Sequence, residues 1–141
     1  VSGTLTDGYG SLYPGVKGCL DSLRSAGVDM ALATNLSVDG LEYFLEQYDL
    51  QEYFSSYKSA QSTAYKPHPL MIEEILLEMG IDCASVLMVG DTAGDIHMAH
   101  NAGVNSCLVG WNGEFSRDAL NALPHEKVEN FRQLVDSLIS K

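Results

Sequence analysis

Two carboxylates lie four residues apart in the run Val89-Gly90-Asp91-Thr92-Ala93-Gly94-Asp95. The run follows the apolar segment 86–89, which stops at Gly90 and predicts a buried strand leading into a helix. In an open parallel sheet such a turn lies at the carboxyl edge, where ligands bind. Carboxylate oxygens are the ligands that a hard cation such as Mg²⁺ prefers. The spacing therefore predicts a cation site at Asp91 and Asp95.

Other polar residues also lie next to the ends of predicted strands and helices. Thr34 and Asn35 follow the apolar strand 30–33, and Lys66 precedes Pro67, where a helix is expected to open. In a doubly wound sheet we expect these groups to converge on the two aspartates. A cation and the lysine ammonium would neutralise phosphoryl oxygens, and the Thr34 hydroxyl would hydrogen-bond one of them. The constellation predicts a phosphate site, in which Asn35 either contacts the substrate or forms the turn.

The elements that position these groups alternate along the chain. Apolar residues recur at helical spacing in five segments, and four short runs are apolar enough for strands. The expected helices cover about 16–26, 38–48, 67–79, 96–102 and 131–138, and the expected strands cover 30–33, 57–60, 86–89 and 106–109. Short apolar strands that alternate with helices indicate an α/β fold with a parallel sheet covered on both faces.

Composition narrows the class of protein. The 141 residues fit one domain, 1–141, and 45% hydrophobic content fits a globular core. A net charge of −11 argues against nucleic acid or an anionic membrane as partner. The three cysteines match neither a disulfide framework nor a zinc site, so we expect buried, reduced thiols in a cytoplasmic protein. No apolar run reaches the ~20 residues that span a membrane, and no signal peptide is visible.

Three motifs in this order resemble those of the haloacid dehalogenase superfamily, which consists mostly of Mg²⁺-dependent phosphatases. Ala33-Thr34-Asn35 is similar to its second motif, Lys66-Pro67-His68-Pro69 to its third, and Gly90-Asp91-Thr92 with Asp95 and Ala102-Gly103 to its fourth. The run Leu12-Tyr13-Pro14-Gly15-Val16 is typical of the phosphoglycolate-phosphatase-like branch. The resemblance covers residues 1–113 and implies a three-layer α/β/α, Rossmann-like core with a mainly parallel sheet.

The same resemblance implies site roles. Mg²⁺ is the implied cofactor, with the Ser2 backbone carbonyl, Asp91 and Asp95 at the metal, and Asp95 either supports the metal site or orients Lys66. Thr34, Asn35 and Lys66 are implied to bind a small phosphorylated metabolite. The catalytic positions of the family are implied to be occupied by Ser2, Thr34, Lys66 and Asp91.

The first motif of the family is incomplete in this sequence. It reads Asp-x-Asp-Gly-Thr in the family and matches Val1-Ser2-Gly3-Thr4-Leu5, so the nucleophilic aspartate would lie one position before Val1. Ser2 stands where the general acid is expected, and a hydroxyl has no useful pKa near neutrality for protonating a leaving group. Relatives with a non-acidic residue there include dehalogenases and phosphonate-cleaving enzymes.

Two larger elements of the family fold also have no counterpart in this sequence. In the family, the residues before the nucleophile form the central strand, between the strands of the second and fourth motifs. Its absence would leave buried backbone groups unpaired, at about 1–3 kcal/mol each, so the strand lies outside this chain or another segment fills the gap. The cap domain is expected to be absent between about 8 and 12, since only Gly8-Tyr9-Gly10-Ser11 separates Asp7 from Leu12. An open site would leave room for a second subunit in a homo-oligomer.

Three functions therefore remain open. The first is a Mg²⁺-dependent phosphatase that acts on a small organic phosphate through an aspartyl-phosphate. The second is a catalytically impaired binding or regulatory module, or an excised core domain. The third is a dehalogenase or phosphonatase-type hydrolase, against which Asp91 and Asp95 argue because dehalogenation needs no metal.

Overall fold

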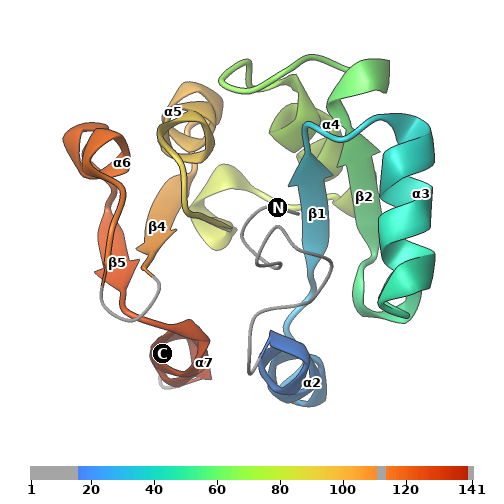
Figure 1. Ribbon diagram of the computed structural model, residues 1–141, viewed down its shortest axis with the longest axis horizontal. Helices are drawn as coiled ribbons and strands as arrows, with labels where there is room; N and C mark the ends of the chain where they lie inside the picture. Colours follow the sequence, from blue (N-terminus) through green and yellow to red (C-terminus); the bar gives the residue numbers. More distant parts are fainter. Residues whose placement is uncertain (1–15, 111–113, 140–141) are drawn as a thin grey trace.

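The computed structural model describes residues 16–110 and 114–139, in which helices and strands alternate (Figure 1). The strands are β1 (Ala31–Thr34), β2 (Ser56–Ser59), β3 (Leu87–Gly90), β4 (Asn105–Val109) and β5 (Glu126–Val128). The helices are α2 (Val16–Ser25), α3 (Val38–Gln47), α4 (Leu70–Met79), α5 (Ala93–Ala102), α6 (Arg117–Asn121) and α7 (Phe131–Ile139). Single 3₁₀ turns cover Gln51–Tyr53, Ala60–Ser62 and Cys83–Ser85. Across these ranges, no helix has the length and apolar character needed to cross a membrane.

All strand pairs in the described residues are parallel, which confirms the predicted sheet type. β1 pairs with β2, with Leu32 opposite Tyr57. β4 lies between β3 and β5, with Cys107 opposite Val89 and Val109 opposite Val128. Within the part of the chain that the structure describes, β1 and β3 do not pair with each other. The interruption falls between the strands of the second and fourth motifs, where the resemblance places the family's central strand.

Helices cover both faces of the strands, which confirms the three-layer arrangement. One apolar cluster joins α2, α3 and α7 to the sheet and includes Leu32 of β1 and Cys107 of β4. On the other face, Ala33 of β1 and Met88 of β3 pack with α4 and α5, and Leu108 of β4 packs with α5 and α6. Successive strand residues point to opposite faces, so neighbours such as Leu32 and Ala33 divide between the two helical layers.

Local signals set several helix ends, but two predicted helix starts are wrong: α4 begins at Leu70 instead of 67, and α5 begins at Ala93 instead of 96. The His68 N–H donates a hydrogen bond of 3.0 Å to the Tyr65 carbonyl oxygen, so a turn precedes α4. The Ser37 hydroxyl oxygen accepts a hydrogen bond of 3.0 Å from the Gly40 N–H and caps α3. Gly80 ends α4 with a φ of 65°, and Gly103 ends α5 with a φ of 74°. These are left-handed conformations that cost an L-residue energy and cost glycine none.

Two short elements are not predicted by the sequence pattern. α6 has five residues, which is too short for a helical period to show. β5 has one buried apolar residue, Val128, after Glu126 and Lys127, and it is a strand because it pairs with β4. Tertiary pairing, rather than local preference, determines such a segment.

The cysteines differ in exposure, and this corrects one expectation. Cys19 and Cys107 are buried as predicted, but Cys83 is exposed. Burial raises the pKa of the Cys19 thiol to about 11. Because the thiolate is the reactive form, we expect iodoacetamide at about pH 8 to modify Cys83 in the folded protein, and Cys19 and Cys107 only after unfolding. Peptide mass spectrometry checks this, and labelling of Cys19 as fast as Cys83 would contradict it.

Candidate active site

The polar residues predicted to form a site come together where β1 and β3 end. Asn35 follows β1, Asp95 lies in the first turn of the helix after β3, and Lys66 contacts both. The Lys66 N–H donates a hydrogen bond of 3.2 Å to Asn35 Oδ1. Lys66 Nζ lies 2.6 Å from Asp95 Oδ1. One lysine therefore ties together the carboxyl ends of two strands that belong to different parts of the sheet.

Asp95 is the most constrained residue of the group. Its side chain is fully buried, and Oδ2 accepts hydrogen bonds from the Thr92 hydroxyl at 2.9 Å, the Asp91 N–H at 3.2 Å and the Thr92 N–H at 3.3 Å. Oδ1 receives no well-angled hydrogen bond in the described residues, but the ammonium of Lys66 compensates its charge. Each oxygen of Asp95 thus has a partner within the protein, an arrangement that suits orientation of Lys66.

Thr92 and Asp95 also form a reciprocal cap at the start of α5. The Asp95 N–H donates 3.2 Å to the Thr92 hydroxyl oxygen, and the Asp95 carboxylate accepts from the Thr92 N–H. This capping box satisfies helix N–H groups that have no partner within the helix. The helix dipole also favours a negative charge at this end. The box has a signal in the sequence, a threonine three residues before an acid, but no role for Thr92 is among the sequence predictions.

Gly90 makes room for this cap at the end of β3. A Cβ at position 90 would lie 2.3 Å from Asp95 Cβ and 2.4 Å from Asp95 Oδ2. No side chain fits there, because the Asp95 carboxylate folds back over the strand end. This spatial requirement explains the glycine between the apolar strand and the first aspartate.

Thr34 and Lys66 are held by their surroundings. Thr34 is buried, and its hydroxyl oxygen accepts a hydrogen bond of 3.2 Å from the Leu36 N–H. The Lys66 side chain is 9% exposed, so its charge acts in a partly desolvated environment. Asn101 of α5 donates 3.0 Å to the Pro67 carbonyl oxygen and fixes the loop that carries Lys66. Hydrogen bonds therefore hold the backbone segments that carry Thr34 and Lys66 in place.

Asp91 is the residue best suited to hold a cation. It is half-buried at the loop between β3 and α5, and its N–H is used by Asp95. No group of three or more His, Cys, Asp or Glu side chains clusters in 16–110 and 114–139. Mg²⁺ is commonly bound through one or two carboxylates, with waters and substrate phosphate completing its shell, so a single carboxylate such as Asp91 could contribute to a Mg²⁺ site. Ser2, the other implied ligand, lies outside the described residues, as do positions 8–12 where the cap was expected to be missing.

Comparison with known proteins agrees with this geometry. A family model described as haloacid dehalogenase-like hydrolase matches residues 4–109. The chain is 35% identical over 128 residues to "Probable phosphatase IndB" of Dickeya dadantii (strain 3937), covering 89% of this chain and 55% of that protein. It is 30% identical over 125 residues to "Phosphoglycolate phosphatase" of Aliivibrio fischeri (strain ATCC 700601 / ES114), covering 88% of this chain and 55% of that protein.

Solved structures show the same fold. A predicted phosphoglycolate phosphatase from Haemophilus somnus 129pt superposes with a TM-score of 0.80 at 27% identity, over 91% of this chain and 57% of that one. The chain spans about half the length of the curated relatives it matches. The matched model covers most of the chain, including the residues gathered around Lys66, so the chain belongs to the haloacid dehalogenase-like hydrolase family.

Proposed function

We propose that the full-length protein is a Mg²⁺-dependent phosphatase that hydrolyses a small organic phosphate. The observation that supports this most is the buried pair of Lys66 and Asp95, which holds an ammonium at the sheet edge shared with Thr34 and Asp91. In a chain with a net charge of −11, an anionic substrate needs positive charge at the site. Because Asp95 compensates the charge of Lys66, the ammonium would supply this charge together with a bound Mg²⁺. The phosphatase and phosphoglycolate phosphatase names of the relatives agree with this reaction class.

Each residue has a distinct role in this proposal. Lys66, oriented by Asp95, neutralises the phosphoryl oxygens as charge develops on them. Thr34 binds a phosphoryl oxygen through its hydroxyl and its backbone N–H, with Asn35 beside it. Asp91, with the Ser2 carbonyl, would hold Mg²⁺, which supplies further charge neutralisation when bound.

The nucleophile in this proposal is an aspartate one position before Val1. Its carboxylate attacks phosphorus, the ester oxygen leaves, and water then hydrolyses the aspartyl-phosphate to free phosphate. The Ser2 hydroxyl is poorly suited to protonate the leaving oxygen, so we expect esters with acidic leaving groups to react best. We also propose a cytoplasmic protein without nucleic-acid or membrane partners, in which a second subunit can cover the open site.

The test is hydrolysis of p-nitrophenyl phosphate with and without Mg²⁺. It is run on this chain and on a version extended upstream by one apolar strand that ends in aspartate. We expect Mg²⁺-dependent turnover only in the extended version, because only that version holds the nucleophile. If neither turns over while Mg²⁺ still binds, the protein is a binding or regulatory module instead.

Replacement of Asp91 by asparagine is expected to lower kcat/KM of the extended protein at least about 100-fold and to weaken Mg²⁺ binding, measured by calorimetry. An amide is a weaker ligand than a carboxylate for a hard cation. Asp118→Asn is a matched control, because Asp118 is an exposed acid in the first turn of α6. Equal effects of both substitutions would contradict the role given to Asp91.

A further inference from the structure

The loop that carries Thr34 is attached to a second segment of the chain. The loop, 34–38, leads from the end of β1 into α3, and the second segment, 59–66, runs from the last residue of β2 to Lys66. Both lie at the carboxyl edge of the sheet, because β1 and β2 pair in parallel with Thr34 opposite Ser59. Hydrogen bonds from several residues of the second segment hold the loop.

Ser59 makes the central contact between the two segments. It is 3% exposed, and its hydroxyl donates a hydrogen bond of 2.6 Å to the Leu36 carbonyl oxygen. The hydroxyl oxygen also accepts a hydrogen bond of 3.1 Å from the Gln61 N–H. Because the hydroxyl uses both its hydrogen and a lone pair, the direction of the Ser59 side chain is fixed. The buried Ser59 hydroxyl therefore holds the backbone of Leu36.

The loop is also held on either side of Leu36. The Val38 N–H donates a hydrogen bond of 2.8 Å to Gln61 Oε1, and the Lys66 N–H donates one of 3.2 Å to Asn35 Oδ1. Backbone that makes many contacts opens less often than backbone that makes few. Contacts at three positions therefore leave the loop little freedom to shift.

Leu36 in turn orients the Thr34 hydroxyl. The Leu36 N–H donates a hydrogen bond of 3.2 Å to Thr34 Oγ1. This contact uses a lone pair of the hydroxyl oxygen, so the hydroxyl hydrogen of Thr34 is directed away from Leu36. Ser59 thus acts on Thr34 through one residue: it holds the Leu36 carbonyl, and the Leu36 N–H sets the direction of the Thr34 hydroxyl.

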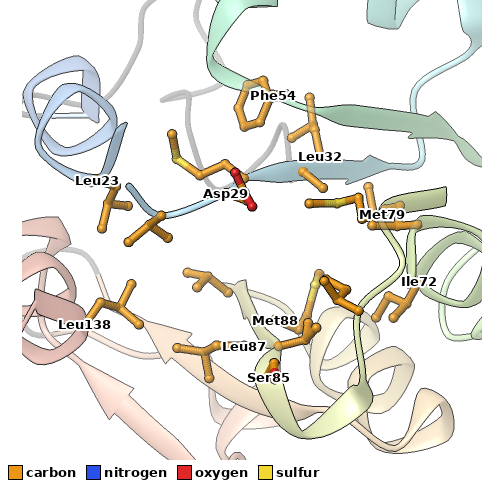
Figure 2. Close-up of a pocket in the computed structure, with 18 of the residues that line it drawn as sticks. Leu23, Asp29, Leu32, Phe54, Ile72, Met79, Ser85, Leu87, Met88 and Leu138 are labelled. Carbon is orange, nitrogen blue, oxygen red and sulfur yellow. The ribbon is translucent and has the colours of Figure 1, made fainter. Parts of the chain in front are cut away.

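Apolar packing aligns the two strands below the loop. Leu32 of β1 and Phe54, just before β2, pack in one apolar cluster, and Figure 2 shows both on the same side of the pocket that they help to line. The contacts of Ser59 and Gln61 extend this alignment from the strands into the loop. The position of the loop is therefore set relative to the sheet as a whole.

We propose that Ser59 is a positioning residue for phosphoryl binding. It holds Leu36, and through Leu36 it directs the Thr34 hydroxyl toward a phosphoryl oxygen, while Gln61 supports the same loop. This role rests on the proposed phosphatase function, in which Thr34 binds the phosphoryl group and Ser59 does not touch it. Hydrogen-bond donors that are fixed before the reaction stabilise developing charge, and a displacement of about 1 Å can cost about 100-fold in rate.

The test is Ser59→Ala in the extended protein. We expect kcat/KM for p-nitrophenyl phosphate to fall about 10- to 100-fold. Amide hydrogen exchange at Leu36, followed by NMR, should become at least about 10-fold faster, because the loop loses its central contact. Ser59→Thr keeps the hydroxyl and should restore most of both properties. Ser56→Ala is the matched control, since Ser56 lies at the other end of β2 and donates 2.8 Å to Glu78.

Gln61 provides a second arm that does not disturb buried structure. Gln61 is exposed, and Gln61→Leu removes the acceptor of the Val38 N–H. Exchange at the Val38 amide should become at least about 5-fold faster, and kcat/KM should fall about 3-fold. Gln61→Glu keeps an acceptor oxygen and should keep the slow exchange. Effects of Ser59→Ala no larger than those of Ser56→Ala, or faster exchange with an unchanged kcat/KM, would overturn the proposal.

Phosphate binding separates this role from the proposed reaction. Calorimetry with inorganic phosphate and Mg²⁺ needs no turnover, and Ser59→Ala should weaken phosphate binding at least about 5-fold while Ser56→Ala leaves it unchanged. Such weakening in a protein without turnover would count against the phosphatase and support the role of Ser59. Turnover with equal kcat/KM and equal phosphate affinity in both variants would overturn the role of Ser59 alone.

Discussion

Replacement of Lys66 by methionine is expected to lower the free energy of unfolding by about 3–5 kcal/mol. Asp95 is fully buried, and Lys66 Nζ at 2.6 Å compensates its charge. Methionine can fill the space of the lysine stem, but it leaves a buried carboxylate without a counter-charge. We also expect kcat/KM of the extended protein to fall about 100- to 1000-fold, because the ammonium that stabilises developing charge is lost. Urea unfolding and p-nitrophenyl phosphate hydrolysis measure the two effects.

Two further variants separate charge balance from catalysis. Lys66→Met combined with Asp95→Asn should recover much of the lost stability, since the uncompensated charge is gone, but should recover no activity. Lys58→Met is the matched control: Lys58 Nζ lies 2.8 Å from Glu78, whose side chain is 51% exposed. Exposed pairs contribute about 0–1 kcal/mol. A loss from Lys66→Met no larger than from Lys58→Met would contradict the importance of the buried pair.

Replacement of Gly90 by alanine is expected to destabilise the protein by about 1–3 kcal/mol or more. The added Cβ would lie 2.3 Å from Asp95 Cβ, a separation at which something must move. Asp95 cannot move without losing its contacts with Thr92, Asp91 and Lys66. Activity of the extended protein should therefore fall with stability, by at least about 100-fold, because Lys66 loses its orientation.

Gly18 offers the matched control for this substitution. It lies within α2, and a Cβ there would meet no heavy atom within 4 Å. Gly18→Ala should raise the free energy of unfolding by about 0.5–1 kcal/mol, because alanine is the better helix former. Thermal unfolding of both variants gives the comparison. A Gly90→Ala protein as stable as Gly18→Ala would show that the Asp95 carboxylate does not occupy the end of β3.

The separate roles of the two aspartates could not be predicted from spacing. Both are acids in one loop, and their spacing predicts a cation site at Asp91 and Asp95, while the family resemblance leaves Asp95 either supporting the metal site or orienting Lys66. In the structure Asp95 is directed into the protein, where Lys66 and the start of α5 use its oxygens, while Asp91 remains half-buried. The difference arises because Asp95 occupies the first turn of a helix, where its side chain folds back on the free N–H groups.

Apolar periodicity in the sequence predicts most of the helices and strands and, from their alternation, a parallel sheet. Other local signals mark helix ends: a capping serine at position 37 and glycines after helices at positions 80 and 103. The candidate site residues were predicted from polar groups at the ends of elements and from the family motifs, and the structure brings Asn35, Lys66 and Asp95 into contact. The elements that the pattern missed, α6 and β5, are short and depend on contacts with the rest of the fold.

Contacts between segments that are far apart in the sequence became visible only in the folded structure. It paired Lys66 with Asp95, which lie 29 positions apart in the sequence, and it joined Ser59 to Leu36, which lie 23 positions apart. Both features depend on which strands are neighbours and on how their ends meet. Hydrophobic periodicity in the sequence describes one helix or strand at a time. The burial of a charge and the pairing of a strand edge depend on how several elements pack together.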